Sequence, residues 1–337
     1  MTTTASSVAS SAPAVGPVSG VLSHRWVRFA VRRLGRLLGS LAVLLTASFL
    51  MIHLIPGDPV RGALGPTAPA ALVEARRESL GLNDPLWLQY WHYLQGVFTG
   101  DFGTSLTSQL PVSDIISQRL PATLTLAIIA FAVAVVVAVP LGVLMGVVTR
   151  RGRGRRSELA FTTTSVVLGT IPDFLIGVGL VYVFGVNLGW LPVAGNATPD
   201  AYVLPVIALA VGPAVILARI IRVEMVAVLE ADFVRTARAK RLPSRTIYLG
   251  HALPNALTAA LTICGLLLGS LVAGTVLVEN VFAWPGLGRT IAQSILSKDY
   301  PVVQAIVLVY GIGVLLANTV VDIVLALLDP RSMIAED

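Results

Sequence analysis

The sequence predicts an all-α, polytopic membrane protein with six transmembrane helices, and three observations lead to this fold class. The 337 residues are 55% hydrophobic and only 12% charged, and the mean hydropathy is +0.82, unlike a soluble globular domain. Apolar runs of about 20 residues, long enough to cross the hydrocarbon core as helices, occur six times. Arginines gather in alternate connections between these runs, as expected for loops on one side of a membrane.

The apolar runs differ in length and in proline content. The second run is longer than a bilayer requires and contains Pro140, and the third contains Pro172, so we expect tilts, kinks or a cytoplasmic extension. Gly142 and Gly146 stand four residues apart in the second run, a spacing that favours close contact between helices. The six runs cover residues 37–54, 121–148, 161–186, 201–221, 256–278 and 302–328.

The distribution of arginine predicts the orientation in the membrane. Arginine clusters precede the first run and separate the second from the third, and a basic segment separates the fourth from the fifth, so these connections should be cytoplasmic. Both termini are then cytoplasmic. The predicted organisation is a disordered tail (1–24) rich in Ser, Ala and Thr, a first transmembrane helix with its basic flank (25–56), an extracytoplasmic segment (57–118), a five-helix core (119–330) and a C-terminus (331–337).

The extracytoplasmic segment has two parts. Four prolines near its start predict irregular structure, whereas residues 85–98, "PLWLQYWHYLQGVF", predict a short helix. The aromatic rings crowded along this helix suit an interfacial belt or a docking surface equally well. The prolines are Pro56, Pro59, Pro66 and Pro69.

The basic segment between the fourth and fifth runs, residues 230–257, reads "EADFVRTARAKRLPSRTIYLGHALPNAL". Phe233 and Ala237 would share a less polar helix face, and Pro243 should end the helix just before it. Physical reasoning alone leaves two readings open, a positive-inside loop lying on anionic lipid or a docking element. Arginines recur every third position as a cationic stripe, at Arg235, Arg238 and Arg241.

The spacing in this segment resembles the cytoplasmic EAA loop of ABC importer permeases, E-A-A-x-x-x-G followed by I-x-L-P. The resemblance implies a coupling helix that docks on an ATP-binding subunit, with Ala237, Arg238 and Ala239 at the contact. Arg241 stands where the pattern has Gly, whose conformational freedom allows a tight turn, and His251 stands where it has Ile. The implied coupling residues are Arg235, Thr236, Ala237, Arg238, Ala239, Lys240, Arg241, Leu253 and Pro254.

Further motifs, spread over nearly the whole chain after the tail, narrow the resemblance to the B-type permease subunit of dipeptide, oligopeptide and nickel importers. They are "HLIPGDPV" (53–60), "LGLNDPLWLQYWHYL" (80–94), "GDFGTSL" (100–106), "RLPATLTLA" (119–127), "LGWLPVAG" (188–195), "FVRTARAK" (233–240), "VENVFAWPGLGR" (278–289) and "DYPVVQ" (299–304).

This resemblance implies a type I ABC importer permease fold in a bacterial inner membrane. The implied partners are a C-type permease, two ATP-binding subunits or one fused ATPase, and an extracytoplasmic solute-binding protein, besides the lipid bilayer. Peptides are the expected cargo, while nickel, glutathione, haem or sugars are alternatives within the same family.

The chain itself is expected to be non-catalytic and to bind no cofactor. It has no G-x-x-x-x-G-K-[ST] sequence to hold a nucleotide, so ATP and Mg would bind to the partner ATPase subunits. Its four histidines are scattered without metal-ligand spacing, so we expect no metal site. We also expect no nucleic-acid partner.

Charged residues inside apolar runs point to a transport path because each is costly when it faces lipid. Asp173 follows Pro172 in the third run and could bind a cationic group such as a peptide N-terminus, or could cap a restarted helix. An ion-coupled secondary transporter that uses Asp173 and Glu279 is the non-ABC alternative, and a membrane scaffold that recruits an acidic partner is another.

For other charges, structural pairing is the expected role. We expect Arg219, Arg222 and Glu224 to pair with one another or to snorkel toward the membrane surface. We expect Glu279 and Asp322 to make structural pairs, for instance with Arg289 or Arg331.

Overall fold

The computed structural model describes residues 19–54, 59–65, 67–79, 81–152 and 154–328. Most of the predicted tail, the C-terminal residues 331–337 and part of the "HLIPGDPV" motif lie outside the described residues. Helix α1 (Ser19–Leu54) begins within the segment predicted to be disordered. The chain divides into two compact units, residues 1–40 and 41–337, and the second contains every candidate site discussed below.

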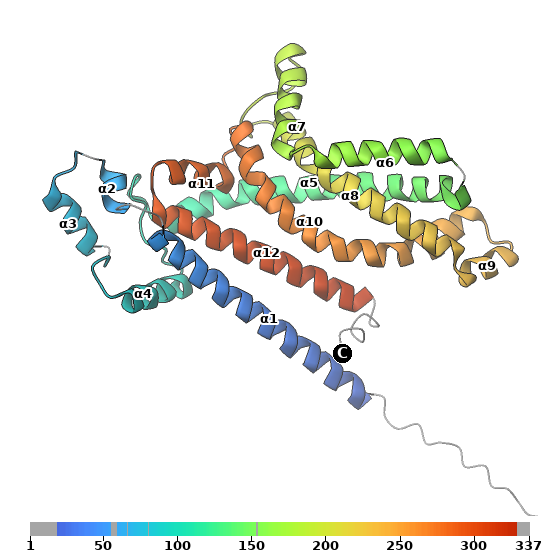
Figure 1. The fold of residues 1–337 in the computed structure, drawn as a ribbon, viewed down its shortest axis with the longest axis horizontal. Helices are drawn as coiled ribbons and strands as arrows, with labels where there is room; N and C mark the ends of the chain where they lie inside the picture. The colour runs from blue at the N-terminus through green and yellow to red at the C-terminus, as the bar shows by residue number, and fades with distance from the viewer. Residues whose placement is uncertain (1–18, 55–58, 66, 80, 153, 329–337) are drawn as a thin grey trace, which may run out of the picture. The chain divides into compact units, whose positions relative to one another are not determined.

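Within the described part of the second unit the architecture is helical, which confirms the predicted fold class (Figure 1). Four long helices form the body, namely α5 (Val112–Val148), α8 (Val203–Glu230), α10 (Leu253–Val281) and α12 (Tyr300–Leu328). Shorter helices are α2 (Pro59–Leu64), α3 (Ala70–Ser79), α4 (Leu86–Thr99), α6 (Arg155–Thr170), α7 (Asp173–Leu180), α9 (Asp232–Ala239) and α11 (Leu287–Leu296). Short 3₁₀ turns are η1 (Arg150–Gly152) and η3 (Pro199–Tyr202), and π-helical segments are η2 (Val181–Asn187) and η4 (Thr246–Ala252).

Five helices of the described chain are long and apolar enough to span a membrane, and a bent pair could supply a sixth span. The five segments are Val31–His53, Val112–Val148, Pro199–Glu230, Ala260–Val281 and Tyr300–Val324.

The third predicted run is not one helix. It is divided between α6 and α7, whose axes differ by 94°. Ile171 is extended (φ −72°, ψ 124°), and Pro172 follows it before α7 begins. Proline lacks an N–H and disfavours the helical conformation of the residue before it, so this break has a local cause. The other expected kink site behaves differently, because α5 continues through Pro140 without ending.

Of the four prolines expected to break regular structure, Pro56 and Pro66 lie outside the described residues, whereas Pro59 and Pro69 stand at helix starts. Pro59 is the first residue of α2, and Pro69 immediately precedes α3. Proline suits these positions because a first-turn N–H has no partner within the helix and the ring fixes a helical φ. The short aromatic helix is confirmed as α4.

The most extensive contact between two helices of the body is that of α5 with α8, which lie side by side in Figure 1. A Cβ added at Gly142 would lie 2.7 Å from Cβ of Ile221, and one added at Gly146 would lie 2.6 Å from Cβ of Met225. Ile221 and Met225 are both fully buried. The predicted close contact at these glycines is therefore confirmed, and its benefit is close approach of two helix backbones.

Candidate functional site

The segment expected to couple to an ATPase forms a short helix, α9, that follows the end of α8. Ala231 is extended (φ −64°, ψ 153°) and turns the chain before Asp232 starts α9. Val234 and Ala237 are buried in one cluster with Leu229 of α8 and Ile247 of η4. Packed side chains thus connect α9 to α8 and to η4, which leads into α10.

The exposed face of α9 differs in part from the predicted contact. Ala237 is only 7% exposed, so its methyl group packs within this chain and offers little surface to a partner. Phe233, which the sequence places on the same face, is 46% exposed. Arg235 is also exposed and pairs with Asp232 (Nη1 to Oδ1, 3.2 Å). The further exposed positions are Thr236, Ala239 and Lys240.

Arg241 occupies the position that ends α9. Its φ is +56°, in the left-handed region. The N–H of Arg241 donates to the carbonyl of Arg238 (2.9 Å), and the N–H of Leu242 donates to that of Ala237 (3.2 Å). This pair of bonds is a Schellman motif, in which glycine is the usual left-handed residue. The structure thus supplies the physical reason for the expected Gly, and Arg241 adopts the same turn at a conformational cost.

The second half of the coupling pattern lies where η4 meets α10. Leu253 packs against the buried cluster that contains Val234 and Ala237, whereas Pro254 is exposed in the first turn of α10. Proline is tolerated there because a first-turn N–H needs no intrahelical partner. The two residues therefore have different environments, one inside the bundle and one on its surface.

Arg222 of α8 does not pair with its predicted neighbour. Its guanidinium donates to the carboxylate of Glu158 in α6 (2.5 Å) and to the hydroxyl of Thr149 at the end of α5 (3.0 Å). The sequence suggested Glu224 because it is close along the chain. The bundle instead places the end of α5 and the first turn of α6 beside this cation of α8, at the expected membrane edge.

The carboxylate of Glu279 is fully buried and accepts hydrogen bonds from several donors. The Thr123 hydroxyl donates to Oε1 (2.7 Å), and the backbone N–H of Arg289 donates to Oε2 (3.0 Å). The Arg289 guanidinium instead donates to the carbonyl of Ala283 (2.9 Å). Glu279 therefore does not pair with the Arg289 side chain, as suggested from sequence, but caps the first turn of α11.

The residues of the motif "VENVFAWPGLGR" (278–289) form this contact between the end of α10 and the start of α11. A Cβ added at Gly286 would lie 2.5 Å from Cδ of Glu279, so a larger residue would displace the carboxylate. The fully buried Trp284 donates from its indole N–H to the carbonyl of Ala122 in α5 (3.1 Å). Trp284 thus holds the segment after α10 against α5, and Gly286 leaves room for the Glu279 carboxylate.

Asp173 has a different environment, at the break between α6 and α7. It is the first residue of α7, is half-buried, and makes no capping hydrogen bond. A Cβ added at Gly212 of α8 would lie 3.2 Å from its Oδ1, and one at Gly274 of α10 would lie 3.0 Å from Oδ2. The carboxylate thus lies between the backbones of two spanning helices, without an ion pair or hydrogen bond to any residue that the structure describes.

Comparison with known proteins gives a consistent result. Residues 138–333 match the model of the binding-protein-dependent transport system inner membrane component, and residues 26–127 match that of the corresponding N-terminal membrane component. The glutathione transport system permease protein GsiC of Escherichia coli (strain K12) is 39% identical over 304 residues, covering 90% of this chain and 98% of the relative. GsiC of Shigella flexneri serotype 5b (strain 8401) matches equally.

Solved structures show the same fold at lower sequence identity. A chain from inward-facing crystals of the MetNI methionine ABC transporter aligns with a TM-score of 0.55 and 20% identity. The alignment covers 64% of this chain and 96% of that chain.

Proposed function

Because this chain belongs to the binding-protein-dependent transport system inner membrane components, we propose that it forms one half of the translocation path of an ATP-driven importer of small peptides. It is a multi-pass inner-membrane permease subunit of an ABC importer and is not itself catalytic. The cargo proposal rests on one observation. The chain is 39% identical to permeases named for glutathione, a tripeptide, over 98% of their length.

The proposed complex contains a second, C-type permease, ATP-binding subunits that hold ATP and Mg, and an extracytoplasmic solute-binding protein. Both termini and α9 face the cytoplasm in this arrangement, and α2 to α4 face outward. The distribution of arginine supports this orientation, because Arg150, Arg151, Arg155 and Arg156 lie in the same set of loops as the coupling segment.

In the proposed coupling step, α9 docks on an ATP-binding subunit through Phe233, Thr236, Ala239 and Lys240, with Arg235, Arg238 and Arg241 adding positive charge at its edges. Val234 and Ala237 pack inward and pass the motion of the docked helix to α8 and η4. Closure of the ATP-binding subunits would then change which end of the path is open.

Asp173 is proposed as the point of the path that receives a cationic group of the cargo, such as the free amino group of a peptide. An unpaired carboxylate between two helices is costly in a membrane and is retained most readily where a ligand pairs with it. Gly212 and Gly274 allow α8 and α10 to approach the carboxylate closely, since a Cβ at either position would lie within 3.2 Å of one of its oxygens.

The test is purification of the tagged chain from native membranes, followed by reconstitution and uptake of a labelled tripeptide. We expect a second permease and an ATPase to co-purify, and uptake to require ATP and the binding protein. Recovery of the chain alone, with uptake driven by a proton gradient, would reject this proposal in favour of the secondary transporter.

A further inference from the structure

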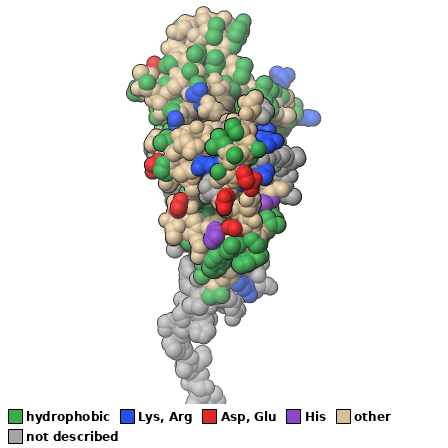
Figure 2. Space-filling view, turned by 90° about the vertical axis from the view of Figure 1, so that its left-hand side faces the viewer, with side chains coloured by type: hydrophobic (Ala, Val, Ile, Leu, Met, Phe, Trp, Pro, Cys, Tyr) green, Lys and Arg blue, Asp and Glu red, His purple; other side chains and the backbone are tan. Residues whose placement is uncertain are grey.

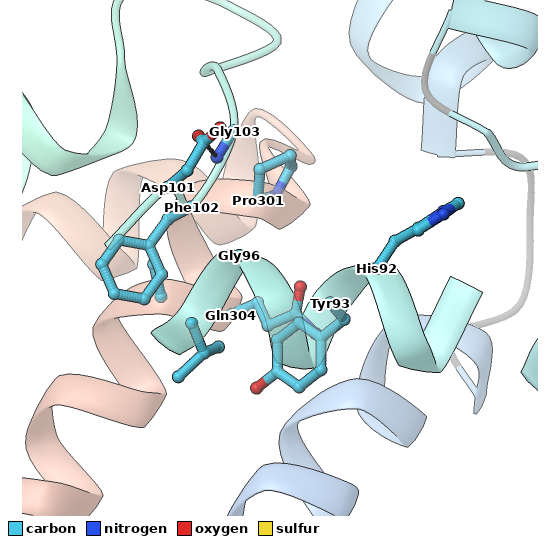
Figure 3. Close-up of a pocket in the computed structure, with 10 residues that line it drawn as sticks. His92, Tyr93, Gly96, Asp101, Phe102, Gly103, Pro301 and Gln304 are labelled. Carbon is cyan, nitrogen blue, oxygen red and sulfur yellow. Dashed lines mark hydrogen bonds between the residues drawn. The ribbon is translucent and has the colours of Figure 1, made fainter. Parts of the chain in front are cut away.

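A small cavity on the proposed extracytoplasmic side joins three separate segments of the second unit. Its volume is about 180 Å³, and it lies between α4, the loop after α4 and the first turn of α12 (Figure 3). Asp101 and Phe102 of the loop lie on one side of the cavity, and the Tyr93 ring lies along α4. His92 is exposed, and its ring points away from the other labelled side chains.

Two residues that line the cavity, Tyr93 and Asp101, carry polar groups in different environments. The Tyr93 hydroxyl is buried beside Ser48 of α1, whose own hydroxyl donates to the carbonyl of Gln304 (3.2 Å). Burial raises the pKa of Tyr93, with a smaller opposing effect of Ser48, so the hydroxyl remains protonated. Asp101 is exposed and uses only Oδ1, which accepts the N–H of Gly103 (3.0 Å).

The walls of the cavity are held in place from both sides. The Asp101 N–H donates to the carbonyl of Gly96 (2.8 Å), and a Cβ added at Gly96 would lie 2.5 Å from the Asp101 carbonyl oxygen. Farther along the loop, the buried Asp299 before α12 accepts the Ser105 hydroxyl, the Leu106 N–H (2.9 Å) and the Thr107 hydroxyl (2.7 Å). The loop is therefore fixed to both α4 and α12, and the site is formed before any partner binds.

The size of the cavity restricts what it can hold. Small-molecule sites typically enclose about 300–1,000 Å³, so this cavity suits one large side chain from another protein. Arginine combines a planar cation, which can bind the free oxygen of Asp101, with a stacking surface for the Tyr93 or Phe102 ring. Arginine is also among the side chains that most often anchor protein interfaces in pockets.

The helix α4, which forms one wall of the cavity, also exposes aromatic side chains. Acidic and basic side chains lie mixed with hydrophobic ones on the face shown in Figure 2. Near the cavity, α4 exposes Trp87 (71%), Trp91 (56%) and Phe98 (78%). Aromatic residues are enriched where proteins associate.

We infer that the cavity between α4, Asp101 and the start of α12 receives an arginine side chain of the extracytoplasmic solute-binding protein. This inference rests on the proposed importer function. The bound arginine would contact α4, the loop and α12 together, so docking outside would be transmitted directly to a spanning helix.

The test uses the complete importer in lipid nanodiscs and the binding protein that stimulates its ATPase. Asp101→Asn removes the charge but keeps an oxygen for the Gly103 N–H, and we expect it to weaken binding of that protein about tenfold. Asp200→Asn is the matched control, since Asp200 is another exposed acid on the proposed outer side. Basal ATPase activity and co-purification of the subunits should be unchanged in both variants.

A double-mutant cycle identifies the partner residue. Each exposed arginine of the binding protein is changed to Gln, and one of these variants should show no further loss when combined with Asp101→Asn. If wild-type complex is stimulated but Asp101→Asn binds normally, or if no arginine couples to Asp101, the inference is overturned while the importer function stands. Absence of any ATPase from the wild-type complex would overturn both.

Discussion

Glu279 at the end of α10 and Asp173 at the start of α7 are both carboxylates within candidate spans, but only Glu279 has partners in the described structure. Glu279 is fully buried and holds α5, α10 and α11 together through hydroxyl and backbone donors. Asp173 is half-buried and borders two glycines without a donor. A carboxylate in a span can therefore be structural or available to a ligand. The number of hydrogen bonds that it accepts from the protein distinguishes the two cases.

The largest effect should come from removing the satisfied carboxylate. Glu279→Ala leaves the Thr123 hydroxyl and the Arg289 N–H buried without an acceptor, and each orphaned group costs about 1–3 kcal/mol. We expect loss of most folded protein in detergent, measured by size-exclusion chromatography and thermal unfolding. Glu78→Ala, at an exposed position of α3, is the control. A variant of Glu279 as stable as the control would remove the structural interpretation.

The same contrast between a packed and an open position recurs in α9, where Ala237 is buried and Ala239 is exposed. Ala237→Glu would place a charge inside the cluster with Val234, which costs several kcal/mol, so α9 should unfold locally and lose the ATPase. Ala239→Glu should change stability by less than about 0.5 kcal/mol yet still weaken ATPase binding. Co-purification and limited proteolysis of the segment measure both effects. Equal protease sensitivity of the two variants would contradict the assignment of faces.

Replacing the open carboxylate tests its availability to cargo. Asp173→Asn should leave thermal stability unchanged and lower uptake of a free-amino tripeptide about tenfold, because a charge-assisted hydrogen bond contributes about 1.5–3 kcal/mol. Uptake of the N-acetylated peptide should not change. If both peptides lose uptake equally, or neither does, Asp173 does not bind the amino group.

The smallest expected effect concerns the left-handed turn at the end of α9. A non-glycine residue in this conformation costs roughly 1–2 kcal/mol, part of which is offset by the greater chain entropy of glycine. Arg241→Gly should therefore stabilise the turn by about 0.5–1 kcal/mol, seen as slower hydrogen exchange of the Leu242 amide. Arg241→Ala keeps the strain and should show no such gain. Faster exchange in the glycine variant would mean that the Arg241 side chain stabilises the turn more than its backbone destabilises it.

Much of the candidate site was predictable because its signals are local. The arginine spacing in residues 235–241 indicated a helix between spans, and the expected Gly at position 241 coincides with an observed left-handed residue. The inward orientation of Ala237 was missed, because the weak apolar pattern of α9 allowed Phe233 and Ala237 on one face. Only packing against Leu229 and Ile247 decides which of the two is buried.

The sequence by itself determined the fold class and five of the six spans, because the length and hydropathy of each run set the cost of placing it in lipid, and its motifs determined the family. The break at Pro172 was also local, although its 94° angle was not. Tertiary structure alone decided the partners of the charges. Thr123 lies 156 residues from Glu279, and Ser105 lies 194 residues from Asp299. Such pairs follow from how helices pack, which no local pattern records, and the same packing leaves Asp173 without a partner in the described chain.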